Sequence, residues 1–173
     1  MLPLLFRECE NLLKGLVILN SAPCLWMEAA VHYAKKHQLP ELTLEMQEFT
    51  ENPNQETFNK ALDACMPYYF PSSTLELGRK LLPQVSFSFE PAVWWQRKAM
   101  EISYNANWVP QSVKTLIIGA EFDAITPCSL FEKDERFNRK NIEKIFIKGA
   151  GHLPWVEKPD EVRNAIHKFL QNL

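Results

Sequence analysis

A single histidine in a glycine-rich turn is the residue of this sequence best suited to chemistry. His152 follows Gly149-Ala150-Gly151, and this turn comes soon after the strand-like run 144–147. Glycines permit a tight backbone turn that brings the imidazole to the end of the preceding strand. A histidine there can take a proton as a general base and return it as a general acid. The alternative interpretation is a buried structural histidine.

An aspartate occupies the same kind of place after another strand-like run. Asp123 follows the apolar run 115–118 and the turn 119–122. The carboxyl end of a strand is where open parallel sheets place their ligands. The Asp123 carboxylate would accept a hydrogen bond from His152 and stabilise the imidazolium formed during catalysis. The alternative is that Asp123 caps the following turn through Thr126.

No residue of the sequence is framed as the nucleophile of a hydrolytic triad. A nucleophile elbow needs glycines two positions before and two positions after the attacking residue, because the turn is strained. The sequence has five glycines, and only Gly149 and Gly151 lie close together, with an alanine between them. Ser21 ends a strand-like run but is followed by alanine and proline, so we reject it as the nucleophile. The sequence predicts an acid and a base without their nucleophile.

Three strand-like runs must position these residues. The run Leu16–Leu19 is continuously apolar, which is typical of a strand buried on both faces of a parallel sheet. The runs 115–118 and 144–147 are the other predicted strands. A short helix is predicted around 130–137, and a final helix begins at Pro159. Strands that alternate with helices indicate an α/β fold with a parallel sheet.

The residues ahead of the first strand and those between the first two strands are predicted to be helical. The end of a helix is predicted over Leu4–Leu13. Five further helices are predicted to begin near Trp26, Glu41, Phe58, Pro71 and Glu90, with Pro67 ending the third. The candidate substrate-binding acids of this block are Glu45, Glu48, Glu90 and Glu101. The simpler interpretation is that these glutamates are exposed to solvent. The simpler interpretation of the neighbouring aromatic residues is that they pack in the core of this helical block, which would form a lid.

Composition excludes several classes of protein. Hydrophobic residues make up 46% of the 173 residues and the net charge is −2, which is ordinary for a globular protein and gives no basic surface for nucleic acid. The four cysteines are scattered and lack the close spacing of a metal site, so we predict no metal and a cytoplasmic location with reduced thiols. The apolar start ends at Arg7, too early for a signal peptide or a membrane span.

The acid and histidine segments resemble those of a known family. Residues 119–127 (GAEFDAITP), 149–152 (GAGH) and 157–160 (EKPD) are similar to the acid and histidine loops of the α/β-hydrolase fold. The greatest similarity is to the proline iminopeptidase-like group, which has a helical cap. In that family one helix and one strand separate the acid from the histidine, which fits the 29 residues between Asp123 and His152 (152 − 123).

The resemblance implies an α/β fold that corresponds to the carboxyl half of an α/β-hydrolase. This half has about three parallel strands with flanking helices and an all-helical cap insertion. Residues 1–22 would form the end of the elbow helix and the first core strand, and residues 23–108 the cap. Residues 109–173 would form the core strands and helices that carry the acid and histidine loops. Five strands, an oxyanion donor and the elbow would lie before Met1.

The resemblance also implies a function. The intact enzyme would hydrolyse an ester or a small peptide amide through an acyl-enzyme, with Asp123 and His152 as catalytic residues and no cofactor. The truncated chain is expected to be inactive alone. The alternative is a non-catalytic binding or assembly module in which the acid and histidine are relics. Because the first strand would have an unpaired apolar edge, we expect a homo-oligomer or pairing with a missing amino-terminal half.

Overall fold

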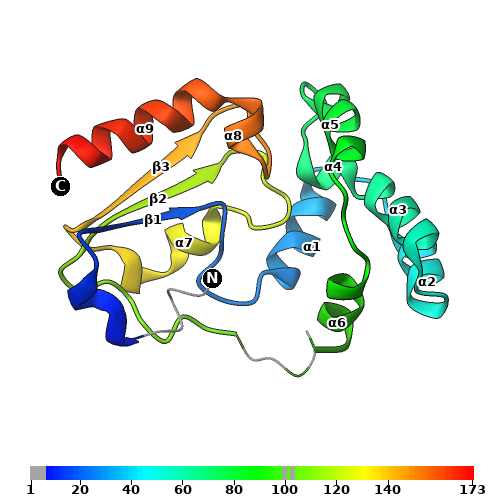
Figure 1. Cartoon of the computed structure of the whole chain (residues 1–173), viewed down its shortest axis with the longest axis horizontal. Helices are drawn as coiled ribbons and strands as arrows, with labels where there is room; N and C mark the ends of the chain where they lie inside the picture. Colours follow the sequence, from blue (N-terminus) through cyan, green and yellow to red (C-terminus); the bar gives the residue numbers. More distant parts are fainter. Residues whose placement is uncertain (1–6, 99–100, 102–103) are drawn as a thin grey trace.

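In the part of the chain that the structure describes, three parallel strands in the order β1-β2-β3 form one sheet (Figure 1). The computed structural model describes residues 7–98, 101 and 104–173. The strands are β1 (Gly15–Leu19), β2 (Lys114–Ala120) and β3 (Ile142–Ile147), and both pairings are parallel. The three predicted strands are therefore present, each slightly longer than its apolar run.

The central strand is the one buried on both faces. Every residue of β2 after Lys114 is buried. In β1 only Leu16 and Ile18 are buried, and the residues between and beside them are partly exposed. The prediction that the first strand is buried on both faces is wrong. In the described part of the chain β1 pairs only with β2, so it lies at the edge of the sheet and is less completely covered.

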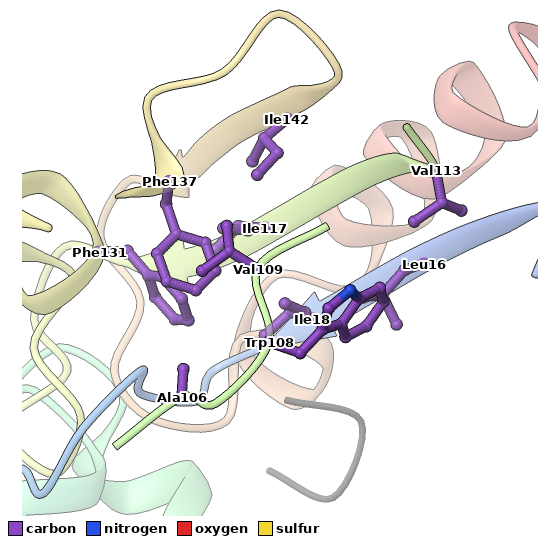
Figure 2. Packing of buried hydrophobic residues seen from close by; sticks show 10 residues of the cluster. All are labelled: Leu16, Ile18, Ala106, Trp108, Val109, Val113, Ile117, Phe131, Phe137 and Ile142. Carbon is purple, nitrogen blue, oxygen red and sulfur yellow. The ribbon is translucent and has the colours of Figure 1, made fainter. Parts of the chain in front are cut away.

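Two apolar layers cover the two faces of the sheet. Helix α9 (Pro159–Gln171) lies on one face, where Val162 and Phe169 pack against residues of β2. Helix α7 (Ser129–Lys133) and the 3-10 helix η4 (Glu135–Phe137) lie on the other face. Figure 2 shows the second layer, which consists of Leu16, Ile18, Ala106, Trp108, Val109, Val113, Ile117, Phe131, Phe137 and Ile142. The layers bury both faces of the sheet, and because all its strands are parallel, their carboxyl ends lie at one edge.

In the described residues between β1 and β2, six α-helices form an all-helical cap. They are α1 (Met27–Lys36), α2 (Thr43–Glu51), α3 (Gln55–Ala64), α4 (Met66–Tyr69), α5 (Leu75–Leu81) and α6 (Glu90–Lys98), with the 3-10 helix η3 (Leu82–Gln84) after α5. Figure 1 shows them grouped beyond the carboxyl ends of the strands. Pro67 follows the end of α3 and lies in the first turn of α4. Backbone N–H groups in the first turn of a helix have no intrahelical acceptor, so a proline, which lacks this group, is tolerated there.

The first and last segments of the cap lie side by side. The Ala106 N–H donates to the Pro23 carbonyl at 2.6 Å, and the Leu25 N–H donates to the Tyr104 carbonyl at 3.1 Å. The Tyr104 hydroxyl donates to the Ala22 carbonyl at 2.9 Å. The cap is therefore inserted into the core through two adjacent connections.

Three smaller differences from the sequence predictions concern helices. The described part of the helix expected over Leu4–Leu13 is a 3-10 helix, η2 (Arg7–Leu12), and residues 4–6 lie outside the described residues. The helix expected around 130–137 is divided into α7 and η4, because Asp134 ends the first and caps the second by accepting from the Arg136 N–H. A short helix, α8 (Pro154–Glu157), was not predicted.

None of the helices in the described ranges has the length and hydropathy needed to cross a membrane.

A carboxylate fastens η2 to the start of β2. Glu10 Oε1 accepts hydrogen bonds from the Gln111, Ser112 and Val113 N–H groups and the Ser112 hydroxyl, and Oε2 accepts from Trp108 Nε1 at 3.0 Å. Desolvation by itself raises the pKa of Glu10, but these hydrogen bonds outweigh it and lower the pKa to about 2. The strand that leads to Asp123 therefore starts from an ionised anchor.

Candidate active site

The Asp123 carboxylate lies at the centre of a hydrogen-bond network at the carboxyl end of β2. Oδ1 accepts from the Ile125 and Thr126 N–H groups at 2.9 and 2.8 Å. Oδ2 accepts from the Thr126 hydroxyl at 2.9 Å and from Asn20 Nδ2 at 3.0 Å. Asp123 is only 1% exposed. Residues 121–128, which this carboxylate organises, are called the acid loop below.

His152 lies against this carboxylate. Its Nδ1 is 3.0 Å from both Oδ1 and Oδ2 of Asp123, and its side chain is 18% exposed. The two interpretations of Asp123 are not exclusive, because the same carboxylate caps its own loop through Thr126 and contacts the imidazole. The structure brings Asp123 and His152 together, while their catalytic roles stay a prediction.

The surroundings of Asp123 favour its charged form. Burial by itself raises the pKa of this carboxyl group, but the hydrogen bond and charge of His152 and the hydrogen bonds from Thr126 outweigh burial. The pKa of Asp123 is therefore below its ordinary value. An ionised carboxylate at Nδ1 keeps the proton of a neutral imidazole on that nitrogen and leaves Nε2 free to accept one.

Asn20 is part of the site although the sequence suggested no role for it. It directly follows β1 with a left-handed backbone (φ 36°), and its N–H donates to the Ile118 carbonyl at 2.8 Å. Its side-chain amide donates to Asp123 and, at 3.4 Å, to the Gly151 carbonyl. Asn20 therefore connects the end of β1 to the acid loop and to the loop that carries His152. An asparagine after a strand suggests only a turn, so the sequence gives no sign of this connection.

The histidine loop (residues 148–153) is held by the acid loop and by the cap. Glu121 Oε2 accepts from the Gly149 N–H at 2.9 Å, and Gly149 has φ of 70°, which favours glycine. The His152 N–H donates to the Tyr69 carbonyl at 2.7 Å. The Tyr69 ring contacts the His152 ring edge-on, with centroids 5.5 Å apart. The cap is therefore in direct contact with the imidazole.

No nucleophile lies against His152 in the described part of the chain. Nε2 makes no hydrogen bond there, and Ser21 makes none with the imidazole. Burial and nearby negative charges raise the pKa of the Cys65 and Cys128 thiols to about 11, and burial raises that of Cys24. Thiols that remain protonated are poor nucleophiles. The acid and the base are assembled, and the position beyond Nε2 has no attacking group among these residues.

The candidate substrate-binding acids and the aromatic residues near them are spread over the cap. Glu48 forms an ion pair with Lys60, and Glu90 accepts from the Ser88 hydroxyl, both on exposed surface. Trp26 and Trp95 stack on each other within the cap, with ring centroids 5.3 Å apart. A cavity of about 700 Å³ lies between α1 and α7 beside the acid loop. No group of three or more metal-ligating side chains occurs in the ranges that the structure describes.

Comparison with solved structures identifies the fold. The chain superposes on a thermophilic esterase from Thermogutta terrifontis with a TM-score of 0.62 and 20% identity, over 95% of this chain and 58% of the esterase. It superposes on an α/β-hydrolase enzyme from a Medee basin deep-sea metagenome library with a TM-score of 0.60 and 15% identity, over 95% and 58%. A proline iminopeptidase-related protein from Thermus thermophilus gives a TM-score of 0.58 and 14% identity, over 91% and 55%.

These likenesses show that the chain has the α/β-hydrolase fold, as the acid and histidine segments predicted. The chain spans somewhat more than half the length of each of these structures. No family model and no curated protein matches the sequence.

Proposed function

We propose that this chain, which has the α/β-hydrolase fold, supplies the acid and the base of a hydrolase for esters or small peptide amides. The observation that carries the proposal is the contact between a buried, ionised Asp123 and His152 Nδ1, with Nε2 unengaged among the described residues. Esterase and iminopeptidase-related structures with this fold support the two substrate classes. The fold alone hosts many chemistries, so the pair is the stronger support.

In the proposed reaction a serine hydroxyl attacks the carbonyl carbon of the substrate. His152 Nε2 takes the hydroxyl proton and passes it to the leaving alcohol or amine, and an acyl-enzyme remains. Asp123 holds the imidazole through Nδ1 and stabilises the imidazolium. Nε2 then takes a proton from a water molecule that attacks the acyl carbon, and gives it to the serine oxygen, so that the carboxylic acid leaves and the serine is regenerated. This chain contributes the two residues that move and stabilise the proton, and the attacking serine lies outside its described residues.

We place the source of the serine beside β1. Carboxyl ends of parallel strands meet at one edge of a sheet, and Asn20 at the end of β1 already contacts Asp123. Within the described residues β1 pairs only on its β2 side. A strand paired with the other side of β1 would end close to His152 and could present a serine to Nε2. The partner we propose is therefore an amino-terminal hydrolase half that carries this strand.

An acyl-ester assay tests the proposal. The chain alone should release no burst of product from an activated ester such as p-nitrophenyl acetate. A fluorophosphonate probe should leave the chain unlabelled and should label a serine in a polypeptide that co-purifies with it. That labelling should be lost with the His152→Ala variant and kept with His167→Ala, which removes an exposed histidine of α9. Labelling of the chain itself, in a way that needs His152, would contradict the proposal.

The second candidate is the non-catalytic binding or assembly module, and the edge of β1 that pairs with no strand among the described residues favours it. In that case the pair is a structural connection between two loops. Both candidates expect an assembly in sedimentation, so the labelling experiment separates them, because only the hydrolase needs a partner with a reactive serine. A homo-oligomer with no labelled serine in any purified complex would support the module.

A further inference from the structure

Glu157 is a buried carboxylate that the proposed proton transfers do not use. It ends α8 and is 9% exposed. No ion pair engages it within the described ranges. Removing a carboxylate from water is unfavourable unless hydrogen bonds replace the lost hydration. The hydrogen bonds of Glu157 therefore account for its burial.

The two oxygens of Glu157 join two separate parts of the molecule. Oε1 accepts from the Gly151 N–H at 2.9 Å, in the histidine loop. Oε2 accepts from the Thr74 hydroxyl at 2.5 Å, in the cap just before α5. Thr74 also bonds to its own segment, since its N–H donates to the Pro71 carbonyl at 2.9 Å. One side chain thus connects the residue before His152 to an ordered turn of the cap.

A second connection between the same segments passes through Tyr69. The Tyr69 carbonyl accepts the His152 N–H, and it lies so close to Gly151 that a Cβ there would be 2.2 Å from this oxygen. The backbone of His152 is therefore bonded directly to residues 69–74 of the cap, and that of Gly151 is connected to them through Glu157.

We infer that Glu157 is a positioning residue, which fastens the histidine loop to the cap through Thr74 and so keeps His152 aligned with Asp123. The inference rests on the proposed function, because alignment matters for catalysis only if His152 is the base. The acid loop holds the backbone of the histidine loop at Gly149 and Ala150. At His152, Asp123 contacts the ring, and among the described residues it is the cap that holds the backbone N–H. The cap segment 69–74 is therefore a fixed part of the site.

Nuclear magnetic resonance of the full chain tests this inference without turnover. The measured quantities are the hydrogen exchange rates of the Gly151 and His152 amides and the downfield proton signal of His152 Nδ1–H. Thr74→Val removes the hydroxyl at nearly constant volume, and Thr74→Ser keeps it. Glu157→Gln keeps an acceptor for Gly151 and can donate to Thr74, whereas Glu157→Ala removes both bonds. Glu161→Gln, an exposed acid in α9, is the matched control.

Thr74→Val should raise both amide exchange rates about tenfold and broaden the Nδ1–H signal, because the loop opens more often. Thr74→Ser, Glu157→Gln and Glu161→Gln should stay close to the unchanged chain. If Glu157→Ala does not fold, Thr74→Val still decides the question. Unchanged exchange and an unchanged signal in Thr74→Val would overturn the inference.

These outcomes are separate from those of the proposed function. If amide exchange in the histidine loop rises in Thr74→Val but no serine is ever labelled, the positioning role of Glu157 is supported and the hydrolase function is contradicted. If a serine is labelled to the same extent with and without the Thr74 hydroxyl, the hydrolase function is supported and the positioning role of Glu157 is contradicted.

Discussion

The acid loop and the histidine loop meet at one hydrogen-bonded pair, but they are held in different ways. Asp123 is held mainly by the N–H groups of Ile125 and Thr126, two and three positions further along the chain. The backbone of His152 is held by Tyr69, which belongs to the cap. The acid loop is thus largely a local structure, whereas the histidine loop is held by the acid loop at Gly149 and Ala150 and, at His152, by a distant segment of the cap. Changes to the two loops should therefore have different consequences.

The largest effect is expected from a side chain at Gly151. In Gly151→Ala the new Cβ would lie 2.2 Å from the Tyr69 carbonyl oxygen, so the cap and the histidine loop must separate. We expect the free energy of unfolding to fall by about 3 kcal/mol, as for severe overpacking. Urea unfolding followed by tryptophan fluorescence measures this loss, and limited proteolysis should show earlier cleavage in the cap.

Gly149→Ala provides the comparison within the same loop. Gly149 has space around it, because a Cβ added there would have Lys158 Cε as its nearest neighbour at 3.8 Å, but its φ is 70°. Only backbone strain should act there, at about 1 kcal/mol. Equal losses for the two alanine variants would show that contact with the cap does not hold the histidine loop.

The next effect is expected at the carboxylate where the two loops meet. Asp123→Ala leaves buried donors of Asn20 and Thr126 without their acceptor, which should reduce the free energy of unfolding by about 2 kcal/mol. His152→Ala should cost less, because the imidazole is partly exposed and Asp123 keeps its other donors. Urea unfolding of both variants makes the comparison. A greater loss in His152→Ala would place the stabilising centre in the histidine loop instead.

A pH-dependent effect of about 1.5 kcal/mol is expected at the start of β2. The folded-state pKa of Glu10 is lowered from 4.5 to about 2, so its contribution is complete above the unfolded pKa. That contribution is lost as the pH falls from about 4.5 towards about 2. Between about pH 6 and pH 3 the unchanged chain should therefore lose more stability than Glu10→Gln. Parallel acid profiles in urea unfolding would show that Glu10 does not act as an ionised anchor.

The smallest effect is expected within the acid loop itself. Thr126→Val removes one hydroxyl donor to Asp123 and keeps the backbone N–H donor, so the loss should be about 1 kcal/mol. Thr126→Ser should restore most of it. Amide exchange should increase in the acid loop and stay unchanged at Gly151. An equal increase at Gly151 would mean that the two loops open together.

Much of the fold could be predicted because its signals are local. Apolar runs located all three strands, and prolines marked several helix starts, including Pro159 at the first position of α9. Burial on both faces of a sheet depends on the neighbouring strands and helices, so it is not a local property. The apolar run of β1 therefore predicted such burial wrongly, and β2 is the strand that is buried on both faces. A residue run cannot show which strand will stand at the edge of a sheet.

The same distinction applies to the candidate site. Asp123 and His152 follow strands in characteristic turns, so the sequence indicates both. Glu157 stands in the run Glu-Lys-Pro-Asp, which has the composition of a solvent-exposed helix start. Its burial depends on Thr74, 83 positions away, and this contact leaves no pattern in the sequence. Asn20 was missed for the same reason, because its partner Asp123 is 103 positions away.

The adjacent ends of the cap have a consequence for how this chain can be altered. Pro23 and Ala106 are joined by a backbone hydrogen bond, so the residues between them form an insertion whose two ends lie next to each other. A short linker between these two positions would close the core without stretching it. Such a core would keep Asp123 and its local donors but would lose Tyr69 and Thr74. A cap transplanted from another protein of this fold would therefore have to supply two groups at the histidine loop. One is a backbone carbonyl in the place of Tyr69, and the other is a hydroxyl in the place of Thr74.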